Sequence, residues 1–322
     1  MVSSGADAGQ TSGERILVLN PVSGSQDHVD DVVELAGDHG FEIRRTEESG
    51  DARRLARDAA PDADLVAAVG GDGTINEVVN GIVDADALES TTVAVIPAGT
   101  GNNFAANIGV QGVEHGFEVI ERGPRRRIDL GLANGRAFVN SCVGGVTAEA
   151  SSETSSESKR ELGVLAYVKN TFETIQSFDS LPLRVETAMD PGGNTVRTWE
   201  GKALFVLVGN CRRFSGTRTA QANAEDGLLE VTIIEDAAAI DLLSDAAREG
   251  LFNRDGTHVV QRRTPSLTIQ SRRDVVEYSL DGEMLETDSL SIETTARALE
   301  IPVGESYRPN PDEDEAEWPF EE

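Results

Sequence analysis

The chain has 322 residues, of which 28 are Lys or Arg and 57 are Asp or Glu, so its formal net charge is −29 at pH 7. The length suggests two domains, and a hydrophobic content of 39% is enough for packed cores, which excludes disorder throughout. Nucleic acid is excluded as the expected partner, because binding to a polyanionic backbone requires Lys and Arg. An anionic membrane surface is disfavoured for the same reason.

Short apolar runs alternate with helical patterns over the first part of the chain. Strands are predicted at 15–19, 41–45, 65–69 and 93–96. The helices expected between and after them cover 28–39, 51–60, 75–83 and 103–107. Because strands that alternate with helices form βαβ units, residues 14–127 are predicted to be a Rossmann-like α/β nucleotide-binding domain with a parallel sheet.

Alternating strands dominate from residue 128 onward. They are predicted at 137–142, 183–187, 202–209, 228–234, 266–270 and 275–280, with helical stretches at 162–178 and 238–251. Residues 128–289 are therefore predicted to form a β-sandwich domain. Residues 290–303 are expected to return as strands that complete the first domain or tie the two together. The polar and acidic segments 1–13 and 305–322 are predicted to be disordered tails.

The sequence contains no recognisable targeting or membrane-spanning segment. Residues 1–14 are small and polar, without the apolar core of a secretory signal, and no run approaches the roughly 18 apolar residues of a spanning helix. A cytoplasmic location is therefore predicted, with peripheral membrane contact at most. The two cysteines, Cys142 and Cys211, cannot form a disulfide framework and are expected in the core.

The charged residues have an unusual composition. Only Lys159, Lys169 and Lys202 are lysines, and the carboxylates are spread along the whole chain. Self-repulsion of such a charge destabilises the compact state in dilute buffer and is screened at molar salt. We hypothesise a halophilic host, with an ordinary acidic enzyme as the alternative.

Three glycine-containing loops follow predicted strands of the first domain. Gly70-Gly71-Asp72-Gly73-Thr74 joins a buried strand to a helix, and the loops 20–24 and 99–103 follow two other strands. Glycines allow close approach of a phosphate, and a helix N-terminus directs unpaired N–H groups at the anion. At one edge of a parallel sheet, the three loops predict a polyphosphate site. A tight turn in which Asp72 only caps a helix is the alternative.

These loops and several later motifs resemble the diacylglycerol kinase catalytic family, particularly its soluble bacterial and archaeal lipid kinases, and more distantly sphingosine and ceramide kinases. The family patterns Asn-Pro-x-Ser-Gly, Gly-Gly-Asp-Gly-Thr-x-Asn-Glu-Val-x-Asn and Pro-x-Gly-Thr-x-Asn-Asp-Phe are matched at 20–24, 70–80 and 97–104. Shorter matches lie at 128–131, 138–140, 209–210, 225–230 and 280–283. The resemblance covers roughly residues 15–303.

The resemblance implies a two-domain kinase that uses ATP and Mg²⁺, with a lipid hydroxyl entering between the domains. The ATP-binding positions of the family fall on Asn20, Pro21, Val22, Ser23, Gly24, Thr46, Gly71, Asp72, Gly73, Thr74, Ile75, Asn76, Glu77 and Thr100. A structural Mg²⁺ site of the bacterial enzymes falls on Asn223, Asp226 and the carbonyl of Leu228. The catalytic acidic pair falls on Asp281 and Glu283, with Glu283 as the proton acceptor.

The chemistry itself requires such residues. Phosphoryl transfer needs positioning, charge stabilisation and a carboxylate near the attacking hydroxyl. Asp281 and Glu283 are two residues apart and form a carboxylate pair either on a strand or in a tight turn. Asp72 competes as the base or as a Mg²⁺ contact, which the sphingosine kinase branch supports. A hairpin turn of the Asp-Gly type is the structural alternative for Asp281 and Gly282.

Two positions depart from the family pattern. Asn103 stands where the family usually has Asp, which removes an anionic ligand for Mg²⁺. Asn223 replaces an Asp in the structural metal site and leaves Asp226 as its one certain carboxylate, so a solvated turn at 223–227 is the alternative there.

The leading hypothesis is an ATP-dependent lipid kinase that phosphorylates a diacylglycerol-like hydroxyl at a membrane surface. An NAD kinase is the alternative enzyme, because that family shares Gly-Gly-Asp-Gly-Thr, although the motifs at 20–24 and 280–283 favour the lipid branch. A non-catalytic nucleotide-binding regulator is a third hypothesis, which Asn103 makes conceivable. An exposed sheet edge would also allow a homodimer.

Overall fold

The computed structural model of the chain describes residues 13–145, 180–190, 192–193, 195–211, 222–236, 258–272 and 275–310. The predicted helices at 162–178 and 238–251 lie outside the described residues, as do residues 1–12 and 311–322 of the predicted tails.

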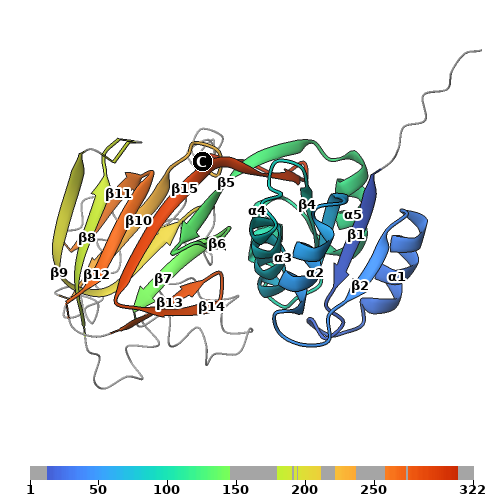
Figure 1. Cartoon of the computed structure of the whole chain (residues 1–322), viewed down its shortest axis with the longest axis horizontal. Helices are drawn as coiled ribbons and strands as arrows, with labels where there is room; N and C mark the ends of the chain where they lie inside the picture. The colour runs from blue at the N-terminus through green and yellow to red at the C-terminus, as the bar shows by residue number, and fades with distance from the viewer. Residues whose placement is uncertain are drawn as a thin grey trace, which may run out of the picture.

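The first half of the chain forms a four-stranded parallel sheet in the order β2-β1-β3-β4 (Figure 1). Its strands are β1 (Glu14–Leu19), β2 (Glu42–Arg45), β3 (Ala63–Gly70) and β4 (Thr92–Pro97). Leu17 and Leu19 share a core with α1 (Val29–Asp38) and α5 (Gly112–Arg122). Ile16 and Val18 face the opposite core, with α2 (Asp51–Ala59), α3 (Asp72–Asp84) and α4 (Asn103–Asn107). Helices therefore cover both faces, as predicted from the βαβ pattern.

Helix α5 is absent from the predicted elements because two of its residues are glycines, which have low helix propensity. The glycine at 116 permits close packing instead, since a Cβ atom there would lie 3.1 Å from Cγ1 of Ile96 in β4. Burial of Phe117 and Ile120 against the sheet supports the helix. Tertiary packing thus outweighs local propensity in this segment.

The second half forms an antiparallel sheet of eleven strands, in the order β14-β13-β7-β9-β8-β12-β15-β5-β6, with β10 between β9 and β11. The strands are β5 (Arg125–Ala133), β6 (Arg136–Phe138), β7 (Ser141–Gly145), β8 (Leu181–Ala188), β9 (Val196–Gly209), β10 (Leu229–Glu235), β11 (Val259–Thr264), β12 (Ser266–Ser271), β13 (Val276–Leu280), β14 (Glu283–Thr287) and β15 (Ser289–Pro302). Side chains from most of them form one apolar core around Phe138 and Tyr278. Strands β11 and β14 were not predicted, because β11 holds one buried residue and β14 none, so neither has a clear apolar pattern.

The predicted strand at 137–142 is interrupted, and its two parts are β6 and β7. The backbone N–H groups of Val139, Asn140 and Ser141 donate to the carboxylate of Asp281, at 2.6, 2.9 and 2.9 Å. These donors are therefore directed at a side chain about 140 residues away in the sequence, and the strand breaks at that point.

Strands β5 and β15 pair with each other along both halves of the molecule (Figure 1). Near the first half, Ile128 pairs with Leu299 and both pack in the core beneath α2 and α3. Near the second half, Ala133 pairs with Ile292 in the other core. The expected boundary after residue 127 thus falls inside β5. Residues 305–310, the first part of the predicted C-terminal tail, pack on the α/β half, where Tyr307 is buried in the core.

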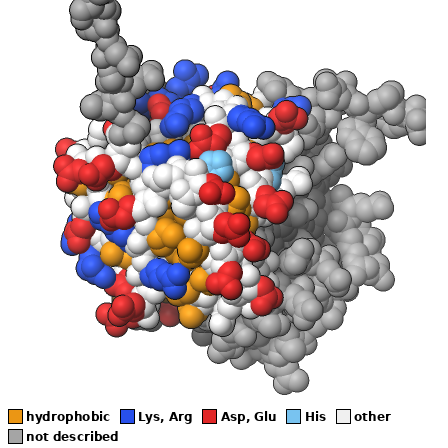
Figure 2. Space-filling model, turned by 90° about the vertical axis from the view of Figure 1, so that its right-hand side faces the viewer, with side chains coloured by type: hydrophobic (Ala, Val, Ile, Leu, Met, Phe, Trp, Pro, Cys, Tyr) orange, Lys and Arg blue, Asp and Glu red, His pale blue; other side chains and the backbone are white. Residues whose placement is uncertain are grey.

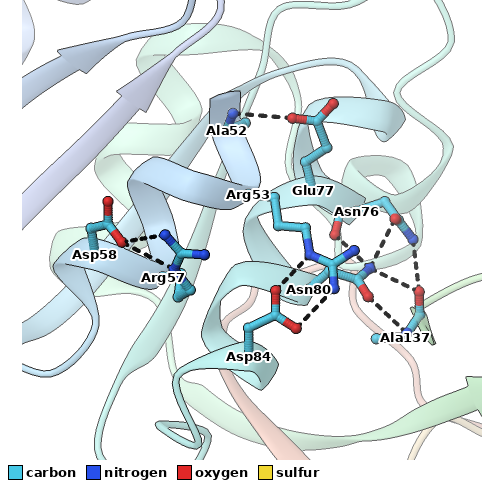
Figure 3. Close-up of polar contacts among 9 residues, drawn as sticks. All are labelled: Ala52, Arg53, Arg57, Asp58, Asn76, Glu77, Asn80, Asp84 and Ala137. Carbon is cyan, nitrogen blue, oxygen red and sulfur yellow. Dashed lines mark hydrogen bonds and ion pairs between the residues drawn. The ribbon is translucent and has the colours of Figure 1, made fainter. Parts of the chain in front are cut away.

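The face of the α/β half seen in Figure 2 carries acidic side chains interspersed with basic ones. Ion pairs on this half include Arg15 with Glu121 and the two-point contact of Arg53 with Asp84 (Figure 3). Within the described ranges, no helix combines the length and the apolar character that crossing a membrane would require.

Candidate functional site

The three glycine loops lie against one another at the carboxyl edge of the parallel sheet. Gly24 has a positive φ of 56°, and a Cβ atom there would lie 2.5 Å from the carbonyl oxygen of Ala98. A Cβ atom on Gly99 would lie 2.3 Å from Cα of Gly71. Both distances are too short for any side chain, so glycine is required where the loops meet. The structure thereby brings together the three loops that the sequence placed at the ends of different strands.

Side chains of the first loop hold the second. Asn20 donates from Nδ2 to Oγ1 of Thr74 at 3.0 Å, and Ser23 Oγ accepts from the N–H of Gly71 at 3.2 Å. Helix α3 begins immediately afterwards at Asp72. Since the first N–H groups of a helix have no partner within it, the turn 72–74 presents backbone donors and the positive end of the helix dipole. This arrangement can bind phosphate oxygens.

Asp72 caps a helix, as one of the two sequence interpretations had it, although the helix is α4 and not α3. Its two carboxylate oxygens accept from the N–H groups of Asn103 and Phe104, both at 2.9 Å. Burial raises the pKa of Asp72, and these two N–H donors oppose that shift. The carboxylate therefore ties the second loop to the third.

Three residues predicted to bind ATP have side chains committed elsewhere. Ile75 is fully buried, and Asn76 is buried against β6. Glu77 accepts from the N–H of Ala52 at the start of α2 (Figure 3) and from the N–H of Gly50, each at 3.1 Å. The N–H of Ile75 also bonds the carbonyl of Gly71 at 3.1 Å, so these residues support the loop from within α3.

The remaining predicted ATP-binding residues lie at the ends of the same strands. Thr46 follows β2, and its N–H bonds the carbonyl of Leu19 at 2.9 Å, so it stays beside the first loop. Thr100 is exposed in the third loop, and Pro21 and Val22 are in the first, where Val22 is 69% exposed.

Helix α3 also holds the second half of the molecule. Asn80 donates to the carbonyl of Ala137 at 3.0 Å and accepts from its N–H at 2.9 Å, as Figure 3 shows. Asn76, one turn earlier, donates to the same carbonyl at 3.0 Å and to Oδ2 of Asp281 at 3.2 Å. One helix thus starts at the glycine loop 70–74 and contacts the turn that carries the acidic pair.

Asp281 occupies a two-residue hairpin turn between β13 and β14. Its φ is 52° and that of Gly282 is 105°, the positive values that an Asp-Gly hairpin turn requires. Its carboxylate accepts from three backbone N–H groups at 139–141 and from Asn76. Burial raises the pKa of Asp281 to about 6 against the opposing effect of these four donors. With four donors on its two oxygens, Asp281 anchors the turn.

Glu283, the first residue of β14, points in a different direction from Asp281. A Cβ atom on Gly73 would lie 3.7 Å from Oε1 of Glu283, so this carboxylate sits beside the turn at the start of α3. Arg136 supports the strand by donating to the carbonyl of Met284 at 3.0 Å. The two members of the acidic pair are therefore separated, one facing β6 and β7 and the other facing the loop.

The side chains of the predicted metal ligands already have protein partners. Asp226 accepts from the N–H of Leu228 at 3.0 Å and from the guanidinium of Arg263, and Asn223 Oδ1 accepts from the N–H of Glu225 at 3.0 Å. The guanidinium on Asp226 opposes the approach of a second cation to that carboxylate. In the part of the chain that the structure describes, no group of three or more His, Cys, Asp or Glu side chains could hold a metal.

Sequence reasoning assigned no role to Asp129, Asn80 or Arg263. Asp129 is completely buried on β5, and an ionisable residue between Ile128 and Leu130 on an apolar strand was a usable signal. Asn80 lies four residues after Asn76, a spacing that places both on one helix face. Nothing in the sequence around Arg263 indicated its partner.

Comparisons with known proteins agree with this architecture. Residues 14–133 match the family model described as the diacylglycerol kinase catalytic domain, and residues 140–303 match the YegS C-terminal NAD kinase beta sandwich-like domain. A Bacillus anthracis str. Sterne structure, described as that of a candidate diacylglycerol kinase, superposes with a TM-score of 0.76 at 24% identity, covering 92% of this chain and 98% of that one.

Two curated relatives extend the match along the sequence. A Pseudomonas fluorescens protein named "Probable lipid kinase YegS-like" is 30% identical over 296 residues, which are 90% of this chain and 95% of the relative. A Bacillus subtilis protein named "Diacylglycerol kinase" is 30% identical over 279 residues, 83% of this chain and 88% of the relative. With both domain models matched in order, the chain belongs to the family of the diacylglycerol kinases and YegS-like lipid kinases.

Proposed function

We propose that the chain is a lipid kinase that transfers the γ-phosphoryl group of MgATP to the hydroxyl of a diacylglycerol-like lipid. The observation that carries this proposal is the position of Glu283 beside Gly73, at the start of α3. Asp72 and Asp281, the other two candidates, have their carboxylates engaged by backbone N–H groups. Glu283 is therefore the base.

In this proposal the backbone N–H groups at 72–74 bind the phosphate oxygens of the nucleotide. The lipid hydroxyl lies between Glu283 and the γ-phosphorus. As its oxygen attacks phosphorus, the hydroxyl proton passes to the Glu283 carboxylate, and the bond from the γ-phosphorus to the bridging oxygen of ADP breaks. The loops 20–24, 70–74 and 97–104 contain no Lys or Arg, so the Mg²⁺ that accompanies the nucleotide offsets its charge.

The lipid acceptor is supported by the names of the two relatives, both of which align with most of this chain. The substrate would be reached at a membrane surface by peripheral contact. Incubation of the full chain with labelled ATP, Mg²⁺ and a panel of diacylglycerols and ether-lipid analogues in molar KCl should label a lipid. NAD is included as an acceptor. Label on NAD would favour the NAD kinase hypothesis, and label on no lipid would contradict ours.

The role of Glu283 has its own test. Glu283→Gln keeps the size of the side chain and removes the base, so kcat should fall by roughly 10²–10⁴-fold while ATP binding is retained. Glu286→Gln is the matched control, because Glu286 is exposed on the same strand, and its kcat should stay near that of the wild type. Equal activity of Glu283→Gln and wild type would exclude Glu283 as the base. If the wild type and Glu283→Gln bound ATP equally and the wild type transferred no phosphate, the result would favour a non-catalytic nucleotide-binding regulator.

A further inference from the structure

The turn formed by residues 223–228, here called the acidic turn, leads into β10 and carries Glu225 and Asp226. The resemblance to the bacterial enzymes implies a metal ion at this turn. In this chain, however, the side-chain oxygens of Asn223 and Asp226 already have protein partners. Asn223 Oδ1 and Asp226 Oδ1 each accept from a backbone N–H two residues ahead, at 3.0 Å. These contacts close the turn on itself without an ion.

A positive charge nevertheless lies at the turn. Arg263, on β11, donates from Nη2 to Oδ2 of Asp226, and its Nε lies 3.8 Å from a carboxylate oxygen of Glu230. The register of the sheet fixes this position, since Arg263 pairs directly with Glu230 across β10 and β11. The guanidinium therefore lies between two carboxylates, one in the turn and one in the strand that follows it.

The neighbouring carboxylate is also held by an arginine. Glu225 accepts two bonds from Arg126 of β5, at 2.9 and 2.6 Å, and a third from the hydroxyl of Tyr307 at 3.0 Å. Its side chain is 12% exposed. Two-point pairing with a guanidinium satisfies a carboxylate in a fixed geometry, so Glu225 is satisfied without a metal ion as well.

The acidic turn is fastened to the strands that join the two halves of the molecule. Asp129 of β5 accepts from the N–H of Gly227 at 2.6 Å and from the N–H of Arg297 of β15 at 2.8 Å. The N–H of Asp129 donates to the carbonyl of Ala224 at 2.7 Å. The position of the turn therefore affects the junction of β5 and β15.

We propose that Arg263 supplies the cation that holds the acidic turn in this chain, and that the turn binds no structural divalent metal ion. In this proposal an arginine takes the place of the metal ion: Asn223 stands where the family has an acidic ligand, and the guanidinium of Arg263 lies on Asp226. A guanidinium on Asp226 both occupies its oxygen and repels a second cation. This inference concerns the stability of the turn and does not depend on the proposed activity.

Thermal unfolding of the full chain without nucleotide tests the proposal, at the lowest KCl concentration that keeps the wild type folded. Samples contain either EDTA or MgCl₂ at matched ionic strength. The wild type should show the same Tm in both. Arg263→Gln should lower Tm by about 2–4 °C, and the control Arg272→Gln, which breaks an exposed ion pair with Glu200, by less than about 1 °C.

A double variant tests the converse, namely whether a metal ion binds once the guanidinium is removed. Asn223→Asp combined with Arg263→Ala restores a carboxylate and removes the guanidinium, so MgCl₂ should raise the Tm of this variant but not that of the wild type. A rise in the wild type with MgCl₂ that disappears in Asp226→Asn would overturn the proposal, because it would place a metal ion at the turn. Equal Tm values for Arg263→Gln and Arg272→Gln would overturn it too.

Discussion

Two Asp-Gly turns of the second half of the molecule hold their aspartates in different ways. Asp281 is satisfied entirely by uncharged donors, namely three backbone N–H groups and the amide of Asn76. Asp226 has one backbone donor and the guanidinium of Arg263, whose side chain is 53% exposed. Both turns lie next to elements that connect the two halves, yet only the first lies next to Glu283.

The difference indicates how each turn responds to its surroundings. Backbone donors have fixed positions and are little affected by salt, so they suit the turn that places Glu283, the base in our proposal. A guanidinium on a flexible, half-exposed side chain gives a weaker contact that ions screen. We therefore expect the Asp281 turn to determine activity, and we expect only the contribution of the Asp226 turn to stability to depend on salt.

The largest expected effect is that of Asp281→Asn. The amide replaces one acceptor oxygen with an N–H₂ group facing backbone N–H donors, so the free energy of unfolding should fall by about 3 kcal/mol. The displaced turn moves Glu283, and kcat should fall by about 100-fold. Denaturant unfolding and steady-state kinetics measure the two effects.

Asp226→Asn is the comparison for this variant. It removes one partly exposed ion pair and should cost about 1 kcal/mol with little loss of kcat. If the two variants lost activity to the same extent, the distinction between the turns would be wrong.

Acid should inactivate the enzyme through Asp281. Its pKa is raised to about 6, and the protonated carboxyl can no longer accept from all four donors, so kcat/KM should fall about tenfold per pH unit below that value. In the unfolded chain the pKa of an aspartate is about 3.9. The native state thus binds this proton more tightly, and this group alone makes the fold more stable as the pH falls from about 6 to about 4.

The two opposite trends make the pH profile diagnostic. Activity and Tm are measured on the same samples from neutral pH to pH about 5, and the residual activity of Asp281→Asn should lack the step near pH 6. A step that persists in that variant would assign the titration to another group.

The smallest expected effect is the salt dependence of the Arg263 contact. Molar KCl should raise the Tm of the wild type, because it screens the repulsion of a formal charge of −29. The same salt should shrink the Tm difference between Arg263→Gln and wild type, whereas the deficit of Asp281→Asn should persist. A wild-type Tm that does not rise between dilute buffer and molar KCl would refute the halophilic hypothesis.

Much of the architecture was predictable because it is local. Apolar runs followed by glycines predicted β1, β3, β4 and the loops at their ends, and a hairpin at Asp281 and Gly282 was an alternative that the Asp-Gly pair raised. These strands and loops depend on backbone conformation within a few residues, which sequence patterns reflect directly.

The partners of individual side chains were less predictable because they are distant in the sequence. Asn76 lies within a nucleotide-binding motif, yet its amide reaches Asp281, 205 residues further along. Asp226 was predicted to bind a metal ion, and the cation beside it is an arginine 37 residues away, placed there by the pairing of β10 with β11. Only the three-dimensional register of the sheet brings such groups together.

The pairing of β5 with β15 has a mechanical consequence. A single linker lets two domains swivel about many axes, whereas two hydrogen-bonded strands behave as a ribbon that resists shear and rotation. The ribbon is irregular between Thr295 and Leu299, where Arg297 has a φ of 51° and its N–H bonds Asp129. Two bonded strands therefore link the halves more stiffly than a single linker would, and the bonds from Asn76 and Asn80 of α3 to Ala137 of β6 add a second connection beside them.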